Sequence, residues 1–146
     1  MAPTQAPPAL LDLITTQNRG VLVTIKSDGR PQLSNVNYAF DREAGTIRIS
    51  ITADRAKYKN LLRDPRASLH VTTADGWSYA VAEAYAEFSD VASDPHDAAV
   101  EELIQLFRDV QGEHPDWDDY RRAMVADRRV LLRLPVTRVY GIAQGG

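Results

Sequence analysis

Two Asp-Gly pairs, Asp28-Gly29 and Asp75-Gly76, each lie between two stretches in which apolar and polar residues alternate. An Asp-Gly pair in that setting is the strongest short-range signal for a β-hairpin. The first pair separates residues 21–26 from about 32–40, and the second separates residues 68–73 from 78–88. The sequence therefore predicts two antiparallel hairpins, and this constrains the fold more than any other feature of the chain.

Two further strands are predicted outside these hairpins. Ile47, Ile49 and Ile51 alternate with polar residues, which is the pattern of a half-buried strand, and residues 130–142 form a last strand bent or interrupted by Pro135. No alternation of strands with helices occurs, as a parallel sheet would need. The fold class we expect is mainly β with flanking helices, with about six largely antiparallel strands.

The second hairpin also carries information about packing. Residues 80, 82, 84 and 86 are all alanine, so one face of this strand consists of small side chains. Small residues along one face indicate close packing against another layer or a tight barrel interior. A barrel-like closure of the sheet is consistent with this pattern.

Helical spacing predicts four short helices. Leu10 and Ile14 open the first, which we expect to end near Gly20, and residues 56–63 form the second, before Asp64-Pro65. The remaining two contain the apolar positions Val100, Leu103, Ile104 and Phe107, and then Trp117, Tyr120 and Met124. With 146 residues, we expect one domain over residues 9–146, preceded by a flexible Pro- and Ala-rich tail over residues 1–8.

Composition excludes several classes of function. The chain has no cysteine, which rules out disulfides, thiolate nucleophiles and zinc–thiolate sites. The net charge of −3 argues against general nucleic-acid binding. No run of about 18 apolar residues or signal peptide is present, so we expect no membrane association and a cytoplasmic location.

Motif searches are also negative for several types of site. The chain has neither a Gly-rich dinucleotide motif nor a phosphate-binding P-loop, and its three histidines lack metal-ligand spacing. Asp116, Asp118 and Asp119 stand where a helix begins, so they are interpreted as complementing the helix dipole rather than as metal ligands. No acid–base pair identifies a catalytic residue. This is compatible with hydride transfer, in which a cofactor carries the reaction and the protein orients it.

The most informative segment, residues 50–60, leads from a strand into a helix with Arg55, Lys57 and Lys59 close together. A helix N-terminus offers unpaired N–H donors, and added cations would make a phosphate site. Thr52 or Asp54 is the expected N-cap. The alternative is a solvated basic helix face paired with nearby aspartates, and this segment alone favours that alternative.

Two other segments allow two interpretations each. The second predicted strand carries four polar residues, Gln32, Ser34, Asn35 and Asn37. They could donate or accept hydrogen bonds with a heterocycle, or they could form the solvent-exposed face of an edge strand, and the pattern supports both interpretations equally. Trp77 and Tyr79 follow the second turn and could stack on a ring or close a dimer interface. Ordinary core packing is the better explanation of these two aromatic residues from the pattern alone.

Taken together, the strand order, the basic loop and helix, and residues 29–35 and 75–81 resemble the pyridoxamine 5′-phosphate oxidase-like split-barrel family. More narrowly, residues 118–121, 127–132 and 139–141 resemble its actinobacterial branch of F420-dependent reductases. The resemblance extends from about Leu10 to Gly141. Its motifs are specific in combination, and none is diagnostic alone.

The resemblance implies a homodimer with two cofactor sites at the subunit interface, and a hydride transferred between C5 of the deazaflavin coenzyme F420 and a small organic substrate. In relatives, basic residues after the third strand hold the cofactor's phosphate, and the polar second strand follows the ring system. Carried over to this sequence, the implied cofactor-binding residues are Gln32, Ser34, Asn35, Ser50, Arg55, Lys57, Asn60, Trp77, Ser78 and Tyr79. The last three would come from the partner subunit.

Two rival functions stay open at the level of the sequence. One is an FMN-dependent oxidase acting on pyridoxine 5′-phosphate or a related amine, and the other is a non-catalytic cofactor-binding protein. The substrate is not encoded in any motif. Tyr58 and Tyr79 are candidate proton donors by residue type only, while Arg128 and Arg129 either bind an acidic tail of the cofactor or pair with Asp127.

Overall fold

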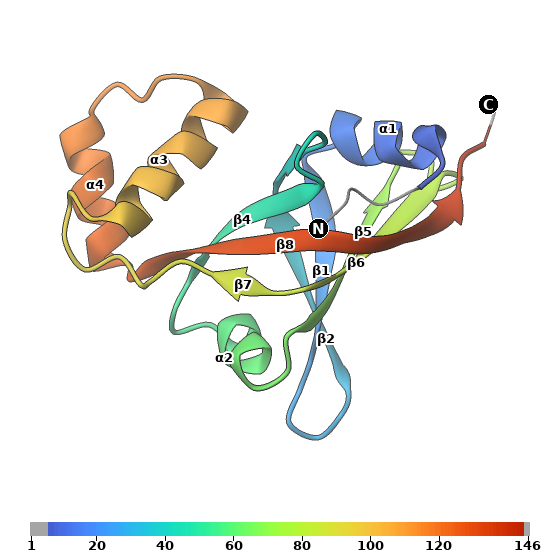
Figure 1. The fold of residues 1–146 in the computed structure, drawn as a ribbon, viewed down its shortest axis with the longest axis horizontal. Coiled ribbons are helices and arrows are strands. Elements are labelled where there is room, and N and C mark those ends of the chain that lie inside the picture. Colours follow the sequence, from blue (N-terminus) through green and yellow to red (C-terminus); the bar gives the residue numbers. More distant parts are fainter. Residues whose placement is uncertain (1–5, 145–146) are drawn as a thin grey trace.

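The computed structural model describes residues 6–144, and its centre is one curled antiparallel sheet (Figure 1). Strands β2, β1, β5, β6, β8, β4 and β3 are neighbours in that order, and β7 also pairs with β8. The predicted fold class is confirmed, with eight strands instead of about six. The additional strands arise because the second predicted strand divides into β2 and β3, and the second half of the second hairpin into β6 and β7. The strands are β1 (Arg19–Ile25), β2 (Pro31–Asn37), β3 (Ala39–Asp41), β4 (Thr46–Thr52), β5 (Arg66–Thr72), β6 (Tyr79–Tyr85), β7 (Glu87–Phe88) and β8 (Arg129–Ile142).

Both predicted hairpins are confirmed. β1 pairs with β2 in the register Val21↔Asn35, and β5 pairs with β6. Gly29 and Gly76 adopt positive φ angles of 88° and 78° in the two turns, a conformation that residues with a Cβ rarely adopt. The turn chemistry of the sequence therefore determines the position of Asn35 at the sheet surface.

Strand β8 joins the two halves of the sheet. It pairs with β4 as far as Pro135 and with β6 from Val136 onward. Pro135 was expected to bend or interrupt the last strand, but β8 is continuous over 14 residues, and Pro135 lies where its partner changes. Proline has no N–H to donate, so this junction is a position where it is tolerated. The change of partner lets the sheet curl into a half-barrel.

Four helices flank the sheet: α1 (Pro8–Thr16), α2 (Ala56–Arg63), α3 (Ala98–Gln111) and α4 (Trp117–Ala126). The prediction that Gly20 ends the first helix is wrong. α1 ends at Thr16, and Gly20 belongs to β1, where a Cβ would lie 2.8 Å from the backbone oxygen of His70. Residues 1–5 of the predicted tail lie outside the described part, and Pro8 already belongs to α1.

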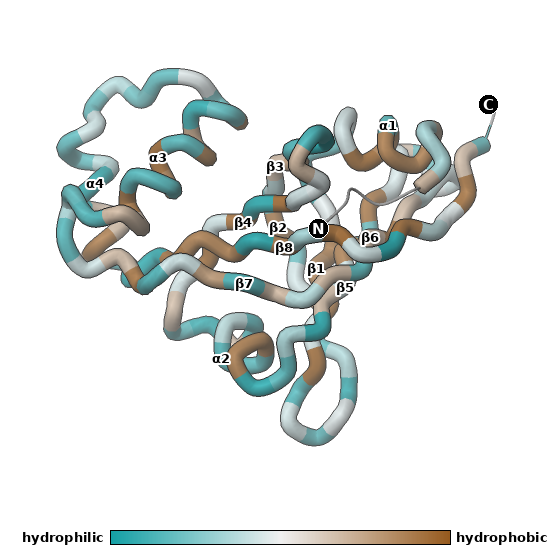
Figure 2. Tube along the Cα trace, in the orientation of Figure 1, coloured by the Kyte–Doolittle hydropathy of each residue, from teal (hydrophilic) through white to brown (hydrophobic). Residues whose placement is uncertain are grey.

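The main core lies inside the half-barrel, where apolar residues from several strands meet (Figure 2). Ile47, Ile49 and Ile51 are almost completely buried, as are the predicted small residues Ala80 and Ala82. Helix α1 closes one end, where the buried hydroxyl of Tyr38 donates a hydrogen bond of 2.6 Å to the backbone oxygen of Ile14.

Helices α3 and α4 form a separate hairpin beside the half-barrel (Figure 1). Their own small core includes Leu103 and Met124, and ion pairs hold α3 to the sheet. Arg48 of β4 pairs with Asp109 at 2.6 Å, which lowers the pKa of that carboxyl, and Arg133 of β8 pairs with Glu102 at 2.7 Å. None of the described helices is long and apolar enough to span a membrane.

Candidate functional site

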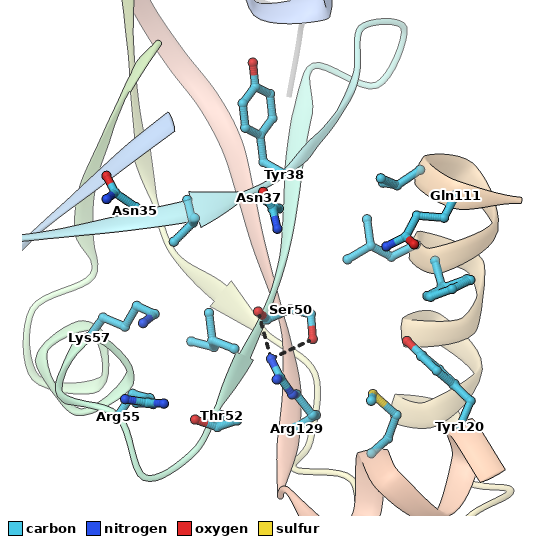
Figure 3. A pocket seen from close by; sticks show the side chains of 16 residues that line it. Asn35, Asn37, Tyr38, Ser50, Thr52, Arg55, Lys57, Gln111, Tyr120 and Arg129 are labelled. Atoms are coloured by element: carbon cyan, nitrogen blue, oxygen red, sulfur yellow. Dashed lines mark hydrogen bonds between the residues drawn. The ribbon is translucent and has the colours of Figure 1, made fainter. Parts of the chain in front are cut away.

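A cavity of about 560 Å³ lies between α2 and the α3–α4 hairpin, with β4 and β8 behind it and β2 at one end (Figure 3). This size is typical of a small-molecule site. Its lining comes from five parts of the chain that are far apart in sequence. The lining residues are Asn35, Val36, Asn37, Tyr38, Ser50, Ile51, Thr52, Arg55, Lys57, Leu106, Phe107, Val110, Gln111, Tyr120, Met124 and Arg129.

Helix α2 brings two cations to one side of the cavity. Arg55 is the N-cap residue and Lys57 lies in the first turn, with both side chains directed toward the cavity (Figure 3). The predicted N-cap, Thr52 or Asp54, is wrong: Arg55 occupies that position, with no capping bond from its side chain and no acidic residue in the first turn. The positive end of the helix dipole is therefore not compensated by a carboxylate within the helix.

Three cations meet at this side of the cavity. Burial, followed by the neighbouring charges of Arg55 and Arg129, lowers the pKa of Lys57. Among the described residues, no carboxylate lines the cavity, and neither Arg55 nor Lys57 has an ion-pair partner. Asp64, one of the aspartates expected to pair with a basic surface face, instead pairs with Arg66 at 2.7 Å. This arrangement favours an anion in the cavity over a solvated helix face.

Two buried polar atoms at this cavity have no hydrogen-bond partner within the described part of the chain: Oγ1 of Thr52 and Nε of Arg129. The Nη1 atom of Arg129 makes only long contacts, of 3.4 Å to the backbone oxygen and 3.5 Å to the hydroxyl of Ser50 (Figure 3). Nε of Arg129 has only an ion-pair contact, of 4.0 Å to Oδ2 of Asp127, whereas the hydroxyl of Thr52 is close enough to Asp54 to lower the pKa of that carboxyl. Buried polar groups are nearly always hydrogen-bonded, so Nε of Arg129 is suited to donate to a polar group of a ligand.

The depressed pKa of Lys57 predicts a specific pH dependence of anion binding. The lysine releases its proton below its usual 10.5, and a bound anion would raise that pKa again. The Kd for inorganic phosphate should therefore already increase as the pH rises toward 10.5. A Lys57→Arg variant keeps its charge throughout this range, so its Kd should stay constant. Equal pH profiles for both proteins, measured by calorimetry, would contradict a role for Lys57 in holding the anion.

Gln32 and Asn60 do not line the cavity but bind each other. The side-chain amide of Asn60 donates to Oε1 of Gln32 at 2.8 Å and to Oγ1 of Thr24 at 3.1 Å. Arg63 in turn donates to Oδ1 of Asn60 at 3.2 Å. This largely buried network connects α2 to the β1–β2 hairpin, so it fixes the position of Arg55 and Lys57 relative to β2.

The other predicted site residues are divided between two regions. Asn35 and Ser50 line the cavity, whereas Ser34 does not. Trp77, Ser78 and Tyr79 lie near the far end of β8, since Tyr79 pairs with Ile142. That is roughly 40 Å along the strand from Arg129. Within one protomer these three residues cannot contribute to the cavity.

Trp77, Ser78 and Tyr79 differ in their exposure and in the residues that they contact. Trp77 is 72% exposed, while Oγ of Ser78 accepts a hydrogen bond of 2.8 Å from the backbone N–H of Gln144. Tyr79 stacks on His70 with ring centroids 5.7 Å apart. The exposed indole of Trp77 is thus the group in this segment most available for contact with another molecule.

Sequence reasoning missed the side of the cavity formed by α3 and α4. Leu106, Phe107 and Met124 have the spacing of ordinary core residues, so no local signal shows whether such a residue packs in a core or lines a cavity.

The hydroxyl groups of two tyrosines in the lining already make hydrogen bonds. That of Tyr120 donates to the backbone oxygen of Leu103 at 3.1 Å, and that of Tyr38 donates to the backbone oxygen of Ile14. Burial raises the pKa of both.

The candidate proton donors and metal ligands lie elsewhere. Tyr58 packs against Phe88 at 5.0 Å and, like Tyr79, is not part of the lining. Asp116 caps α4 by accepting a hydrogen bond from the N–H of Asp119, which confirms its role at the helix start. Residues 6–144 contain no cluster of potential metal ligands. The described cavity can therefore bind an anionic, partly apolar molecule, and its lining contains no carboxyl group.

The chain is similar to a known protein family and to several solved structures. The family model for pyridoxamine 5′-phosphate oxidase matches residues 6–143. The chain is similar to the structure of an F420 reductase, with 25% identity, coverage of 92% of this chain and 98% of that one, and a TM-score of 0.69. It is also similar to a conserved hypothetical protein from Mycobacterium tuberculosis, with 22% identity, coverage of 98% and 94%, and a TM-score of 0.70.

A third similar structure is a heme-binding protein from Mycobacterium smegmatis, with 20% identity, coverage of 97% of this chain and 57% of that one, and a TM-score of 0.68. A reductase and a heme-binding protein thus share the same architecture. The fold alone does not distinguish among them, so the function must be argued from the cavity.

Proposed function

This chain belongs to the pyridoxamine 5′-phosphate oxidase family, and from that premise we propose that its cavity binds the deazaflavin coenzyme F420 and that the protein is an F420-dependent oxidoreductase. The observation that carries the proposal is the cluster of Arg55, Lys57 and Arg129, which lines the cavity without a carboxylate among the described lining residues. Such a cluster suits the phosphate of a flavin-type cofactor.

The residues present fit such a cofactor. Arg55 and Lys57 would hold the phosphate, and Nε of Arg129, which makes no hydrogen bond within the described residues, offers a further donor. The amide of Asn35 is available at the β2 end for polar atoms of a ring system, whereas Oδ1 of Asn37 accepts a long hydrogen bond of 3.4 Å from Nε of Arg19. When bound in its reduced form, F420 supplies a hydride to an organic acceptor. These residues bind the cofactor and orient it, and the described lining contains no carboxyl group.

F420 is preferred to FMN because an F420 reductase is similar over almost the whole of both chains at 25% identity. FMN stays the alternative because it also carries a phosphate and because the matching family model is that of an oxidase. The two differ in their reaction with oxygen: reduced FMN reacts readily, whereas a deazaflavin hydride does not.

Fluorescence titrations of the purified protein with F420 and with FMN test this preference. We expect a Kd for F420 in the micromolar range and a Kd for FMN at least roughly tenfold higher, a difference of about 1.4 kcal/mol. Tight FMN binding with weak F420 binding would contradict the proposal and favour the oxidase, which oxygen consumption would then test. Turnover of reduced F420 with an added quinone distinguishes an enzyme from a protein that only binds the cofactor.

We further propose that the protein acts as a homodimer in which the partner subunit completes the cofactor site with Trp77, Ser78 and Tyr79. Exposed apolar side chains near one end of β8 support association, because a contiguous exposed apolar patch marks an interaction site. Trp77, Tyr140 and Ile142 lie there and are 72%, 43% and 52% exposed. Sedimentation equilibrium should give twice the chain mass of 16.2 kDa. A protein that sediments as a monomer and still binds F420 with micromolar affinity would contradict this part of the proposal.

A further inference from the structure

Helices α3 and α4 form an apolar wall opposite the cation cluster. This α3–α4 wall is defined by the residues of the two helices that line the cavity: Leu106, Phe107, Val110, Gln111, Tyr120 and Met124. None of these six side chains is charged at neutral pH, whereas Arg55 and Lys57 lie on the opposite side and Arg129 of β8 lies between the two sides (Figure 3). The two sides of one cavity therefore favour chemically different groups.

The α3–α4 wall is held in place by aromatic packing and ion pairs. The ring of Phe107 contacts those of His114, Trp117 and Tyr120, with centroids 5.1 to 5.7 Å apart. On the sheet side, the pairs Arg48–Asp109 and Arg133–Glu102 fix α3 to β4 and β8. The wall is thus preformed, which reduces the ordering cost of binding a ligand against it.

Few polar groups remain available on this wall. The hydroxyl of Tyr120 is engaged with the backbone oxygen of Leu103. Gln111 makes no side-chain hydrogen bond with another described residue, so its amide can bind a polar atom of a ligand near the end of α3. Val110, in the last turn of α3, is 41% exposed although it lines the cavity. An exposed apolar side chain at a cavity edge loses water contact when an apolar ligand covers it.

We propose that the α3–α4 wall is the subsite for the hydride acceptor: it binds the uncharged, largely apolar part of a ring-sized substrate, and Val110 controls which substrates fit. This inference rests on the proposed function, because the cation cluster on the opposite side is assigned to the cofactor's phosphate. Positively charged substrates are disfavoured, since the described lining contains three cations and no carboxylate.

The test uses 1,4-naphthoquinone as a neutral ring-sized probe and 1,4-naphthoquinone-2-sulfonate as its anionic counterpart. The chain has no cysteine, so addition of the quinone to thiols does not interfere. Calorimetry measures the binding of both probes to protein loaded with oxidised F420 and to protein without cofactor. In turnover, each quinone takes up one hydride from the reduced cofactor and one proton from water, giving the hydroquinone and the oxidised cofactor.

Three variants distinguish a specific effect of the α3–α4 wall on quinone binding from a general effect of added charge. Val110→Glu should raise the Kd of the neutral quinone by about fivefold or more, because a carboxylate disfavours apolar contact, and should weaken the sulfonate further. Val110→Lys should weaken the neutral quinone but bind the sulfonate more tightly than Val110→Glu does. Ala98→Glu, which adds a charge at the exposed start of α3 and outside the lining, should leave both affinities unchanged.

The Kd for F420 should change by less than about twofold in Ala98→Glu, because position 98 lies outside the cavity and solvent screens the new charge. The Kd for F420 is also measured in both Val110 variants, so that each quinone titration starts from protein saturated with F420. If F420 binds normally but the affinity of the neutral quinone does not depend on position 110, or if wild-type protein binds no quinone, the subsite is wrong while the proposed function stands. If the quinones show the expected dependence but F420 does not bind, the proposed function is wrong and the subsite stands.

Discussion

Lys57→Ala is expected to weaken F420 binding at least tenfold. The lysine lies in the first turn of α2, is partly buried in the cavity and has no ion-pair partner among the described residues. A charge-assisted hydrogen bond to phosphate contributes about 1.5–3 kcal/mol, which corresponds to a change of tenfold or more in Kd. The fluorescence titration that measures wild-type affinity also measures this loss.

Lys59→Ala is the matched control, because Lys59 is an exposed residue of the same helix and does not line the cavity. Its Kd should stay within about twofold of wild type, since an exposed charge outside the site contributes little. Equal weakening by the two alanine variants would show that only the general positive charge of α2 matters. Unchanged affinity in Lys57→Ala would remove the lysine from the site altogether.

The loss of binding should not come from loss of stability. The lowered pKa of Lys57 means that folding disfavours its charged form, because the side chain is desolvated and lies near two arginines. The folded protein releases this proton at a lower pH than the unfolded chain, so the charge reduces stability below the lowered pKa, and this cost fades as the pH rises toward 10.5. At neutral pH, Lys57→Ala should therefore unfold at the same or a higher urea concentration than wild type.

Gly141→Ala is expected to reduce the free energy of unfolding by about 3 kcal/mol or more, or to prevent folding. Gly141 has a φ of +150° and pairs with Ala80 across β6 and β8. An added Cβ would lie 2.1 Å from the backbone oxygen of Tyr79 and 2.9 Å from Cα of Ala80. Neither backbone atom can move without disrupting the strand pair that closes the half-barrel. Urea unfolding followed by circular dichroism measures the effect.

Gly76→Ala provides the comparison for this effect. Gly76 also has a positive φ, of 78°, but an added Cβ would meet no atom within 4 Å. Its substitution should therefore cost only the conformational penalty, about 1–2 kcal/mol. If the two variants lose the same stability, backbone conformation alone determines the cost, and the close approach of β6 to β8 is not the reason for glycine at position 141.

Local patterns predicted the elements that depend on local physics. The Asp-Gly turns and the alternating isoleucines are short-range signals, and the structure confirms the hairpins and β4 built on them. Gly20 was misread because a glycine after a helical segment indicates a helix end as readily as a close strand contact. The contact that explains this residue is with His70, which lies 50 positions away and leaves no local signal.

The candidate site was predictable only on one side. Arg55 and Lys57 are close in sequence, so their cluster could be recognised, whereas Arg129 reaches Ser50 across 79 residues of chain through the β4–β8 pairing. From the sequence, Arg129 could be proposed only to bind an acidic tail of the cofactor or to pair with Asp127, and the structure places its Nε 4.0 Å from Oδ2 of Asp127. The α3–α4 wall could not be predicted at all, because helix periodicity does not show whether Phe107 and Val110 face a core or a cavity.

The residues expected from a partner subunit could be proposed only from the family resemblance, because neither local sequence patterns nor one protomer shows their roles. The roles of Trp77, Ser78 and Tyr79 depend on a second subunit, since these residues lie near the opposite end of β8 from Arg129. They stay predictions until the dimer is examined. Gln32 and Asn60, which the resemblance implied as cofactor ligands, form the network that positions α2, so their contribution to the site is expected to be indirect.

A crystal structure of the protein grown with F420 tests the central claim most directly. The expected result is electron density for the cofactor's phosphate within hydrogen-bond distance of Lys57 and Arg55, in the cavity between α2 and the α3–α4 hairpin. Density for the phosphate at any other place, or a cofactor bound with this cluster in contact only with solvent, would contradict the account.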